Sequence, residues 1–517
     1  MHPLAKLDHA HVWHPFTQMR DWLRRKPIVI TEGRGAVLRD VNGREYLDAN
    51  SSIWTNLHGH QHPKINAAIV RQLKKIAHSS ALGFANEPAS LFGETLVAAA
   101  NSGRLGGTSF TSPHSKRAES ANEIPSAAGG LNKVFYSDDG STALEVALKL
   151  AYQYTLRIRG RPTGRTTARA GKLKFLSLDG AYHGDTIGAV SLGHIDLFHQ
   201  AYGGMLFPTD KVMSPYCYRC PFNRARPERA DARKYRKCRW ECVGKVEQKF
   251  STQKKTGNPY AAFVFEPLMQ GAAGMIPQPS GWLGQVTEIA RAHGALLIAD
   301  EVMTGFGRTG VTCHVNDKVV ADVAQKPAAA KLFATARVGV TPDFLCVAKG
   351  LTGGYLPMAA TLTTQKIFDA FLGDYAEFKT FFHGHSFTGN QLGSAAALAS
   401  LELLQSVASV RARARLQQQL HEELQSLWAL PNVGDIRQVG LVAGIELVRD
   451  WRTRQPFDLR EQAGIRVCEA MARRGVLTRP VGNVIVLMPP YCTTGAQLGK
   501  MVASLAAGIR AFSGRSR

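Results

Sequence analysis

A single lysine stands where an apolar run ends and a glycine-rich segment begins. Lys349 follows the run DFLCVA (343–348), so its amine is expected at the end of a buried strand. A second apolar run, ALLIAD (295–300), ends in Asp300. A buried carboxylate needs a partner, because an unpaired buried charge is costly. An amine that can attack a carbonyl group and a carboxylate that can pair with a cation are therefore candidates for one site.

Three further segments carry groups that complement this pair. Gly140 and Ser141 stand where a strand is expected to turn into a helix, and free backbone N–H groups there suit a phosphate. Tyr182 follows another apolar run, and Ser386 lies in a polar, glycine-rich turn. Together these are the parts of a pyridoxal phosphate site, in which the lysine forms a Schiff base and the carboxylate keeps the ring protonated. Each part alone has a structural explanation, such as a helix cap, but their joint order favours the cofactor site.

Short apolar runs and helical patterns alternate between these residues. Strands are predicted at 133–137, 174–179, 261–267, 295–300 and 343–348, and helices at 141–157, 281–294 and 389–407. This alternation is typical of an α/β fold with a parallel sheet covered by helices. Ligands bind at the carboxyl ends of the strands in such sheets, and the candidate residues fall there.

The chain is expected to form a large, doubly wound, mostly parallel sheet domain and a smaller α+β lobe. Residues 71–405 would form the large cofactor-binding domain and residues 406–517 the small lobe. Residues 1–70 would contribute to the small lobe, and they contain a hairpin pattern with an Asn-Gly turn at 35–48. Insertions into the large domain are expected at about 101–130, 157–174, 217–242 and 311–330.

The composition fits a globular protein with a sizeable core. The 517 residues are 44% hydrophobic and 20% charged, which argues against bulk disorder. No uninterrupted apolar run reaches transmembrane length, and the N-terminal residues lack the layout of a signal or transit peptide. A cytoplasmic location without membrane association is therefore expected.

The formal net charge of +23 is concentrated in two runs. Residues 157–174 contain seven basic residues and no acid, and residues 219–239 contain nine basic residues and two acids. Such runs can bind nucleic acid, but they more often form solvated loops, and no nucleic-acid-binding motif accompanies them. No nucleic-acid partner is expected, although a basic nucleic-acid-binding protein on an enzyme-like fold is the alternative from a different class.

Four of the eight cysteines are closely spaced, namely Cys217, Cys220, Cys238 and Cys242. Their spacing is similar to that of a structural zinc site, and the favoured alternative is four ordinary cysteines in a polar insertion. Zinc bound there would be structural, because four thiolates leave no open position for a substrate. No metal is expected at the catalytic site.

The segments around the candidate residues resemble a known family. LLIADEVMTGFGRTG (296–310) and PDFLCVAKGLTGGYLPMAATL (342–362) are similar to the signature of the class III, ω-type, pyridoxal-phosphate-dependent aminotransferases. The resemblance covers nearly the whole chain apart from the insertions. It implies the fold-type-I architecture, pyridoxal 5'-phosphate as cofactor, and a homodimer with shared active sites.

Other segments are similar to the branch of this family that acts in biotin biosynthesis. They include HVWHPFTQM (11–19), SSIWTNLHGHQHP (51–63) and TRPVGNVIVLMPPY (478–491). This resemblance implies transfer of an amino group from S-adenosylmethionine to 8-amino-7-oxononanoate, giving 7,8-diaminononanoate. The alternatives are lysine as the donor to the same acceptor, another class III ω-aminotransferase, or aminomutase or decarboxylase chemistry with the same cofactor.

The resemblance also implies roles at the cofactor. Lys349 would hold the cofactor covalently and move the substrate proton. Asp300 would pair with the pyridinium, and Tyr182 would stack on the ring and line the substrate pocket. Gly140 and Ser141 would bind the phosphate.

The remaining implied roles concern the substrates. Trp54 would form a wall of the substrate pocket, and Arg479 would bind the substrate carboxylate with a bidentate fit. Phe16 stands where the family often has tyrosine, and Ile53 stands where better-known members have a second tryptophan. Both positions would belong to the pocket that meets the amino donor.

One segment is expected to act across the dimer. Gly384, His385 and Ser386 would come from the partner subunit and close the phosphate site. Residues expected in or beside the pocket without a defined contact are Asp185, Glu266 and Arg308. For Arg308, a structural ion pair is the alternative.

Overall fold

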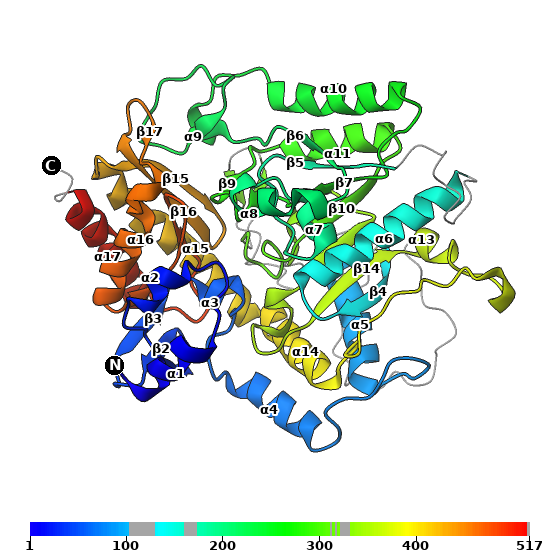
Figure 1. Ribbon diagram of the computed structural model, residues 1–517, viewed down its shortest axis with the longest axis horizontal. Helices are drawn as coiled ribbons and strands as arrows, with labels where there is room; N and C mark the ends of the chain where they lie inside the picture. Colours follow the sequence, from blue (N-terminus) through cyan, green and yellow to red (C-terminus); the bar gives the residue numbers. More distant parts are fainter. Residues whose placement is uncertain (103–129, 160–172, 311–312, 316–317, 321–330, 514–517) are drawn as a thin grey trace.

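A seven-stranded sheet forms the centre of the computed structural model (Figure 1). The structure describes residues 1–102, 130–159, 173–310, 313–315, 318–320 and 331–513. The strands in spatial order are β4 (Leu131–Ser137), β14 (Ala359–Thr364), β13 (Phe344–Val347), β10 (Leu296–Asp300), β7 (Ala262–Phe265), β5 (Phe175–Leu178) and β6 (Asp210–Val212). The five strands from β13 to β6 run parallel, whereas β14 is antiparallel to both of its neighbours. The five predicted strands are confirmed, while β14 and β6 are additional.

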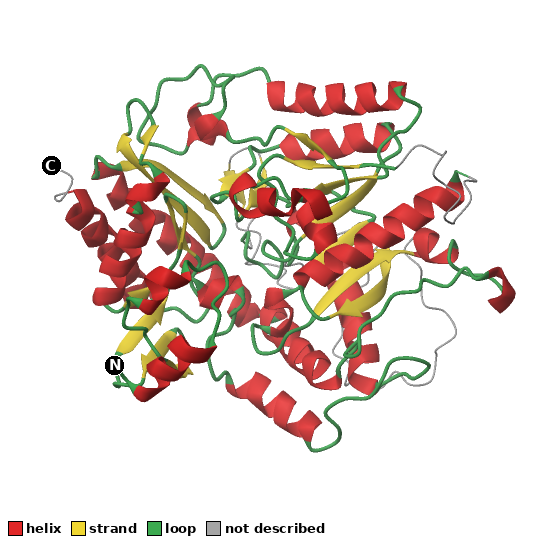
Figure 2. Ribbon diagram, viewed as in Figure 1, coloured by secondary structure: helices red, strands yellow, loops and turns green. Residues whose placement is uncertain are grey.

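Helices cover both faces of this sheet, as Figure 2 shows. Alternate residues of β10 point to opposite faces because the side-chain period of a strand is two. Leu297 and Ala299 pack in one cluster with α11 (Trp282–Ala292), whereas Ile298 packs in another with α6 (Gly140–Ile158). Two apolar layers explain why the strands are apolar throughout, and they confirm the doubly wound fold.

Further helices complete the large sheet's two faces. They are α5 (Glu87–Asn101), α10 (Glu241–Lys255) and α14 (Gln391–Gln405). All three predicted helices are present, and each begins within two residues of its predicted first residue.

The C-terminal residues form a second, antiparallel sheet. Its strands are β15 (Val433–Val439), β16 (Val442–Asp450), β20 (Val484–Leu487) and β19 (Pro480–Val481), with β17 (Gln455–Pro456) beside β16. Helices α15 (Val407–Gln425), α16 (Ala463–Arg473) and α17 (Gly495–Ser513) accompany this sheet.

The N-terminal residues share a sheet with the C-terminal part of the chain. Strands β1 (Ile30–Arg34), β2 (Val37–Asp40) and β3 (Glu45–Asp48) form an antiparallel set, and β18 (Val476–Leu477) adds to β3 in parallel. The expected Asn-Gly turn joins β2 to β3, where Gly43 has a φ of 78°. The division of the chain at residues 70 and 405 stays a prediction.

The four-cysteine insertion packs on the small sheet. It contains the short helices η3 (Cys217–Arg219) and α9 (Ala232–Tyr235). Arg229 donates to the backbone oxygens of Val433 and Leu430, both at 2.5 Å. Arg219 donates to Glu446 at 2.7 Å. Several of the basic residues in this run therefore bind other parts of the same chain.

The predicted zinc alternative has no support among the described residues. Cys217 and Cys242 are buried, Cys220 and Cys238 are half-buried, and all four are free thiols. Within the described ranges, no group of three or more His, Cys, Asp or Glu side chains is arranged to hold a metal ion.

The other predicted insertions lie wholly or partly outside the described residues. This applies to most of 101–130 and 157–174. In 311–330 the structure describes two short antiparallel strands, β11 (Cys313–Val315) and β12 (Lys318–Val320). In the part of the chain that is described, no single helix is long and apolar enough to cross a membrane. Helices 391–405 and 407–429 meet the requirements of length and apolar composition only together, as a pair bent by 70°.

Candidate active site

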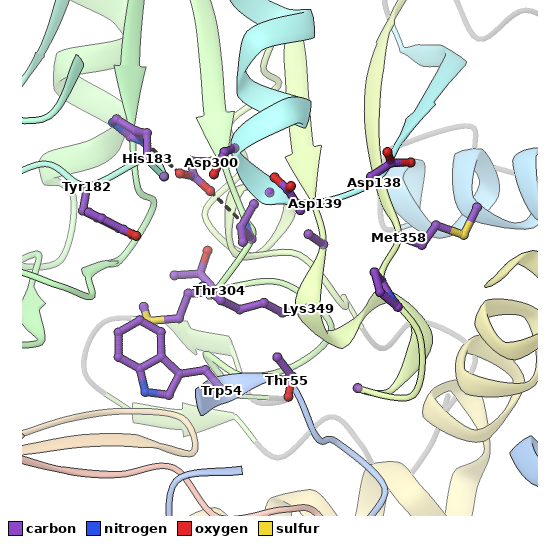
Figure 3. A pocket seen from close by; sticks show the side chains of 18 of the residues that line it. Trp54, Thr55, Asp138, Asp139, Tyr182, His183, Asp300, Thr304, Lys349 and Met358 are labelled. Atoms are coloured by element: carbon purple, nitrogen blue, oxygen red, sulfur yellow. Dashed lines mark hydrogen bonds and ion pairs between the residues drawn. The ribbon is translucent and has the colours of Figure 1, made fainter. Parts of the chain in front are cut away.

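A cavity of about 470 Å³ lies at the carboxyl ends of β10 and β13, beside the first turn of α6 (Figure 3). This is the edge where α/β sheets bind ligands, and the volume suits a small-molecule cofactor with a substrate. The sequence-predicted residues that line it are Trp54, Gly140, Ser141, Tyr182, Glu266, Asp300 and Lys349. The folded chain thus brings together seven residues that are separated by up to 295 positions in the sequence.

Lys349 directly follows β13, and its side chain extends into the cavity (Figure 3). Its Nζ atom lies 5.0 Å from the centroid of the Trp54 ring. Burial lowers the pKa of Lys349, and the charges of Asp300 and Glu266 offset this effect only in part. A lowered pKa increases the neutral fraction of the amine, which is the form that attacks an aldehyde.

Asp300 is held at both carboxylate oxygens. Its Oδ1 accepts a hydrogen bond from the backbone nitrogen of Val302 at 3.0 Å, and its Oδ2 lies 2.7 Å from Nδ1 of His183. Burial would lower the pKa of His183, but the hydrogen bond and charge of Asp300 outweigh it and the pKa is raised. His183 was not predicted as a site residue, although it follows Tyr182 directly in the sequence.

The first turn of α6 has the features of a phosphate site. Asp139 caps the helix by accepting from the backbone nitrogen of Thr142 at 3.0 Å, which fixes Gly140 and Ser141 at the cavity. A Cβ atom on Gly140 would lie 2.8 Å from Cγ1 of Val302, so a larger residue has no room there. The positive end of the helix dipole and its N–H groups favour an anion at this position.

Tyr182 is fixed through its backbone and its hydroxyl group. The hydroxyl donates to Asp185 at 2.8 Å, and the backbone nitrogen donates to Glu266 at 3.3 Å. Burial raises the pKa of Glu266 to about 7, and its other carboxylate oxygen accepts from the backbone nitrogen of Gly271 at 2.8 Å. Asp185 and Glu266 therefore hold an aromatic wall of the cavity in place.

The amine, the anchored carboxylate, the aromatic ring and the helix N-terminus meet around one cavity. A lysine of lowered pKa suits an aldehyde, an anchored carboxylate suits a pyridinium, and the turn of α6 suits a phosphate. The donor set thus fits pyridoxal 5'-phosphate.

Arg308 connects two chain segments beside the cavity. Its guanidinium donates to the backbone oxygens of Asn56 at 2.8 Å and Pro489 at 2.9 Å, and it lies 5.0 Å from the Tyr491 ring centroid. Among the described residues, no carboxylate lies within ion-pair distance of Arg308. The alternative of a structural ion pair is therefore wrong, and Arg308 joins backbone segments instead.

Two predicted substrate residues lie outside the cavity but close to each other. Arg479 is exposed and donates to the backbone oxygen of Phe16 at 3.1 Å. The Phe16 ring contacts Phe198 with centroids 5.4 Å apart, and Phe198 contacts Tyr182 with centroids 6.4 Å apart. Ile53 is 45% exposed and does not line the cavity either.

The segment expected to act across a dimer also lies outside this cavity. Gly384 is exposed, with no described atom within 4 Å of the position of a Cβ. Nδ1 of His385 is 3.9 Å from Asp138, which lines the cavity. The backbone oxygen of Ser386 lies 2.8 Å from Nε2 of His78.

Comparison with known proteins identifies the family. The model of the family "Aminotransferase class-III" matches residues 19–326 and 327–509. The chain belongs to the class-III aminotransferase family. This class-III aminotransferase is a pyridoxal-phosphate-dependent enzyme of fold type I, as its sequence signature predicts.

Several similar proteins carry one name, adenosylmethionine-8-amino-7-oxononanoate aminotransferase. The protein of that name from Geobacter sulfurreducens is 43% identical over 99% of this chain and 98% of its own. The one from Methanocaldococcus jannaschii is 38% identical over 96% of this chain and 95% of its own. A crystal structure of an enzyme of that name from M. jannaschii has a TM-score of 0.79 and 36% identity, covering 98% of each chain. A PLP-bound amine transaminase from an uncultivated Pseudomonas species has a TM-score of 0.78 and 30% identity, covering 96% of this chain and 98% of its own.

Proposed function

We propose that this aminotransferase transfers the amino group of S-adenosylmethionine to 8-amino-7-oxononanoate, giving 7,8-diaminononanoate in biotin biosynthesis. The observation that carries the proposal is the 43% identity over 99% of the chain to a relative named for these two substrates. The cavity supports it, because it contains the lysine, carboxylate and helix N-terminus that amino transfer with pyridoxal phosphate requires.

The residues at the cofactor have distinct tasks in this proposal. Bound pyridoxal phosphate supplies an electron sink for the carbanion character that develops at the substrate. Lys349 would hold the cofactor covalently between turnovers, and its amine would move the proton between the substrate Cα and C4′ of the cofactor. Asp300, anchored by His183, stabilises the positive charge at the pyridine nitrogen. Gly140 and Ser141 bind the phosphate.

Other residues are assigned to the substrates in this proposal. Trp54 and Tyr182 form walls against which the substrate chain lies. Arg479 binds a substrate carboxylate with its planar guanidinium, beside the backbone of Phe16. Because Ile53 is exposed and outside the cavity, its difference from tryptophan does not by itself alter the described lining.

We also propose that the enzyme is a cytoplasmic homodimer in which Gly384, His385 and Ser386 complete the partner's phosphate site. Large apolar side chains flank this segment and its neighbour around residue 80, which supports a covered face. They are Leu82 (88% exposed), Phe84 (72%), Phe382 (72%) and Phe387 (58%). The His78 and Phe387 rings are 4.8 Å apart and join the two segments into one surface.

Absorbance spectroscopy of the purified enzyme tests the proposed function. Cofactor bound to Lys349 should absorb at about 420 nm, and S-adenosylmethionine should shift the band to roughly 330 nm as the amino group is taken up. Adding 8-amino-7-oxononanoate should restore the first band, and Lys349→Ala should lack it. If the band responds to lysine but not to S-adenosylmethionine, lysine is the amino donor and the proposed acceptor is retained. A protein that forms no band with added cofactor would contradict the proposal.

A further inference from the structure

Four consecutive residues with side chains adopt the left-handed backbone conformation beside the cavity. The φ angles of Ser51, Ser52, Ile53 and Trp54 are 47°, 47°, 65° and 69°. The left-handed conformation is unfavourable for residues other than glycine, because the Cβ approaches the following carbonyl oxygen. Such a run persists only where the surrounding contacts compensate for it, and strained segments of this kind cluster at functional sites.

The carboxylate of Asp48 provides compensating contacts. Asp48 ends strand β3 and is 3% exposed. Its Oδ1 accepts from the backbone nitrogens of Ser52 at 3.0 Å and Asn50 at 3.3 Å, and its Oδ2 accepts from the Ser52 hydroxyl at 2.8 Å. Nε2 of His60 lies 3.3 Å from the same Oδ2. Three of these four contacts reach the turn or the residue before it.

The left-handed turn decides which side chain faces the catalytic lysine. Trp54 lines the cavity 5.0 Å from Nζ of Lys349, and it packs at Gly271, where a Cβ would lie 3.3 Å from the indole. Ile53, the residue before it, is 45% exposed. A right-handed turn would rotate these side chains about the backbone, so the position of the indole depends on the sign of φ.

Asp48 also lies beside the strand that leads to Arg479. Asp48 pairs with Leu477 in the parallel β3–β18 ladder, and the nitrogen of Ala49 donates to the oxygen of Leu477 at 2.9 Å. Arg479 follows Leu477 by two residues. The end of β3 therefore contacts both turn 51–54, which carries Trp54, and strand β18, which precedes Arg479.

We propose that Asp48 is a positioning residue for amino transfer, which holds turn 51–54 left-handed and so fixes Trp54 as a wall of the substrate pocket beside Lys349. The part of this inference that concerns amino transfer rests on the proposed function. The contacts that hold the turn belong to the protein alone, so they can be tested without a substrate.

Asp40 provides a matched control for Asp48. It is 7% exposed and lies in the same sheet, where it accepts from the backbone nitrogens of Asn42 at 2.9 Å and Arg44 at 3.0 Å. It therefore caps the turn between β2 and β3, and it does not line the cavity. Asp40→Ala and Asp48→Ala both remove a buried, hydrogen-bonded carboxylate, but only the second should affect Trp54.

Hydrogen–deuterium exchange of the holoenzyme gives a readout that is independent of activity. In Asp48→Ala, amide exchange in 50–56 should become at least ~10-fold faster, whereas Asp40→Ala should accelerate exchange only around residues 41–46. In the holoenzyme, Asp48→Ala should raise KM for the amino donor at least ~5-fold and change the visible circular dichroism of the cofactor, while Asp40→Ala stays within about twofold. Ser52→Gly added to Asp48→Ala should restore part of the loss, because glycine adopts positive φ without strain.

The possible results separate this inference from the proposed function. The positioning role would be refuted if amides 50–56 of Asp48→Ala exchanged at the wild-type rate. It would also be refuted if Asp40→Ala and Asp48→Ala raised KM for the amino donor to the same extent. If Asp48→Ala does not fold, Ser52→Ala removes one donor to the carboxylate and should show the same changes to a smaller extent. If exchange responds as expected but the wild type reacts with no donor, the proposed function fails and the role of Asp48 in holding the turn stands.

Discussion

Replacing Arg437 with methionine should destabilise the small lobe strongly. Its fully buried guanidinium donates to Asp435 at 2.9 Å, to Glu446 at 2.6 Å and to the backbone oxygen of Met275 at 2.8 Å. Arg437→Met would leave two buried carboxylates without this cation. Removing one partner of a buried ion pair typically costs about 3–5 kcal/mol. With an unfolding entropy near 2.1 cal/mol/K per residue, that corresponds to roughly 3–5 °C in the thermal midpoint for a chain of this length that unfolds as one unit.

The pH dependence of this loss follows from the two carboxylates. In the wild type, burial raises the pKa of Asp435, whereas burial at Glu446 is outweighed by Arg437 and Arg219 and its pKa is lowered. Without Arg437, both folded-state pKa values should lie above the unfolded values of about 4. A raised carboxylate pKa means that stability is lost as pH rises through the folded-state value. The difference in unfolding free energy between Arg437→Met and the wild type should therefore be smaller at pH 5 than at pH 8.

Arg449→Met is the matched control for this experiment. Arg449 pairs with Glu461 at 2.6 Å, but its side chain is 44% exposed, and exposed pairs contribute only about 0–1 kcal/mol. Scanning calorimetry or the loss of circular dichroism at both pH values gives the midpoints. The reasoning would be refuted if Arg437→Met and Arg449→Met lowered the thermal midpoint equally. It would also be refuted if the decrease in Arg437→Met were the same at both pH values.

Three further predictions concern the residues assigned to the cofactor and the substrates. Asp300→Asn should retain the cofactor band through Lys349 but lower kcat/KM by at least ~100-fold, because the neutral amide stabilises a pyridinium poorly; an unchanged kcat/KM would contradict this role. Gly140→Ala should weaken cofactor binding about tenfold in a titration, since its Cβ would lie 2.8 Å from Val302, and adding Val302→Ala should restore binding. Arg479→Lys should raise KM at least ~10-fold for substrates with a carboxylate and leave that of a simple amine unchanged; equal effects on both would exclude carboxylate binding.

The sequence predicts the central strands and the main cavity residues because both depend on local patterns. Continuous apolar runs mark β7, β10 and β13, and the residues after two of these runs, Asp300 and Lys349, lie at the cavity. Strand β14 escapes prediction, since it follows β13 after a short glycine-rich connection that contains no α-helix.

Pairings between distant residues are not visible in local patterns. His183 meets Asp300 across 117 positions, and nothing in the AYHGD segment indicates that partner. The basic run 219–239 has the composition of a solvated loop, but its Arg229 binds backbone oxygens about 200 positions away. Composition records how many charges a segment carries, whereas the fold decides what those charges meet.

The pairing of β3 with β18 has a consequence during synthesis. Arg44, just before β3, hydrogen-bonds to the backbone oxygen of Ala472, 428 positions later. At about 5–20 residues per second, a ribosome needs roughly 20–90 s to make the intervening chain. During that interval β3 has no β18 beside it, and the edge of a short amphipathic sheet is open to other chains. The wall of the substrate pocket is therefore among the last parts of the enzyme to assemble, and nascent chains should depend on chaperones most strongly before residue 476 emerges.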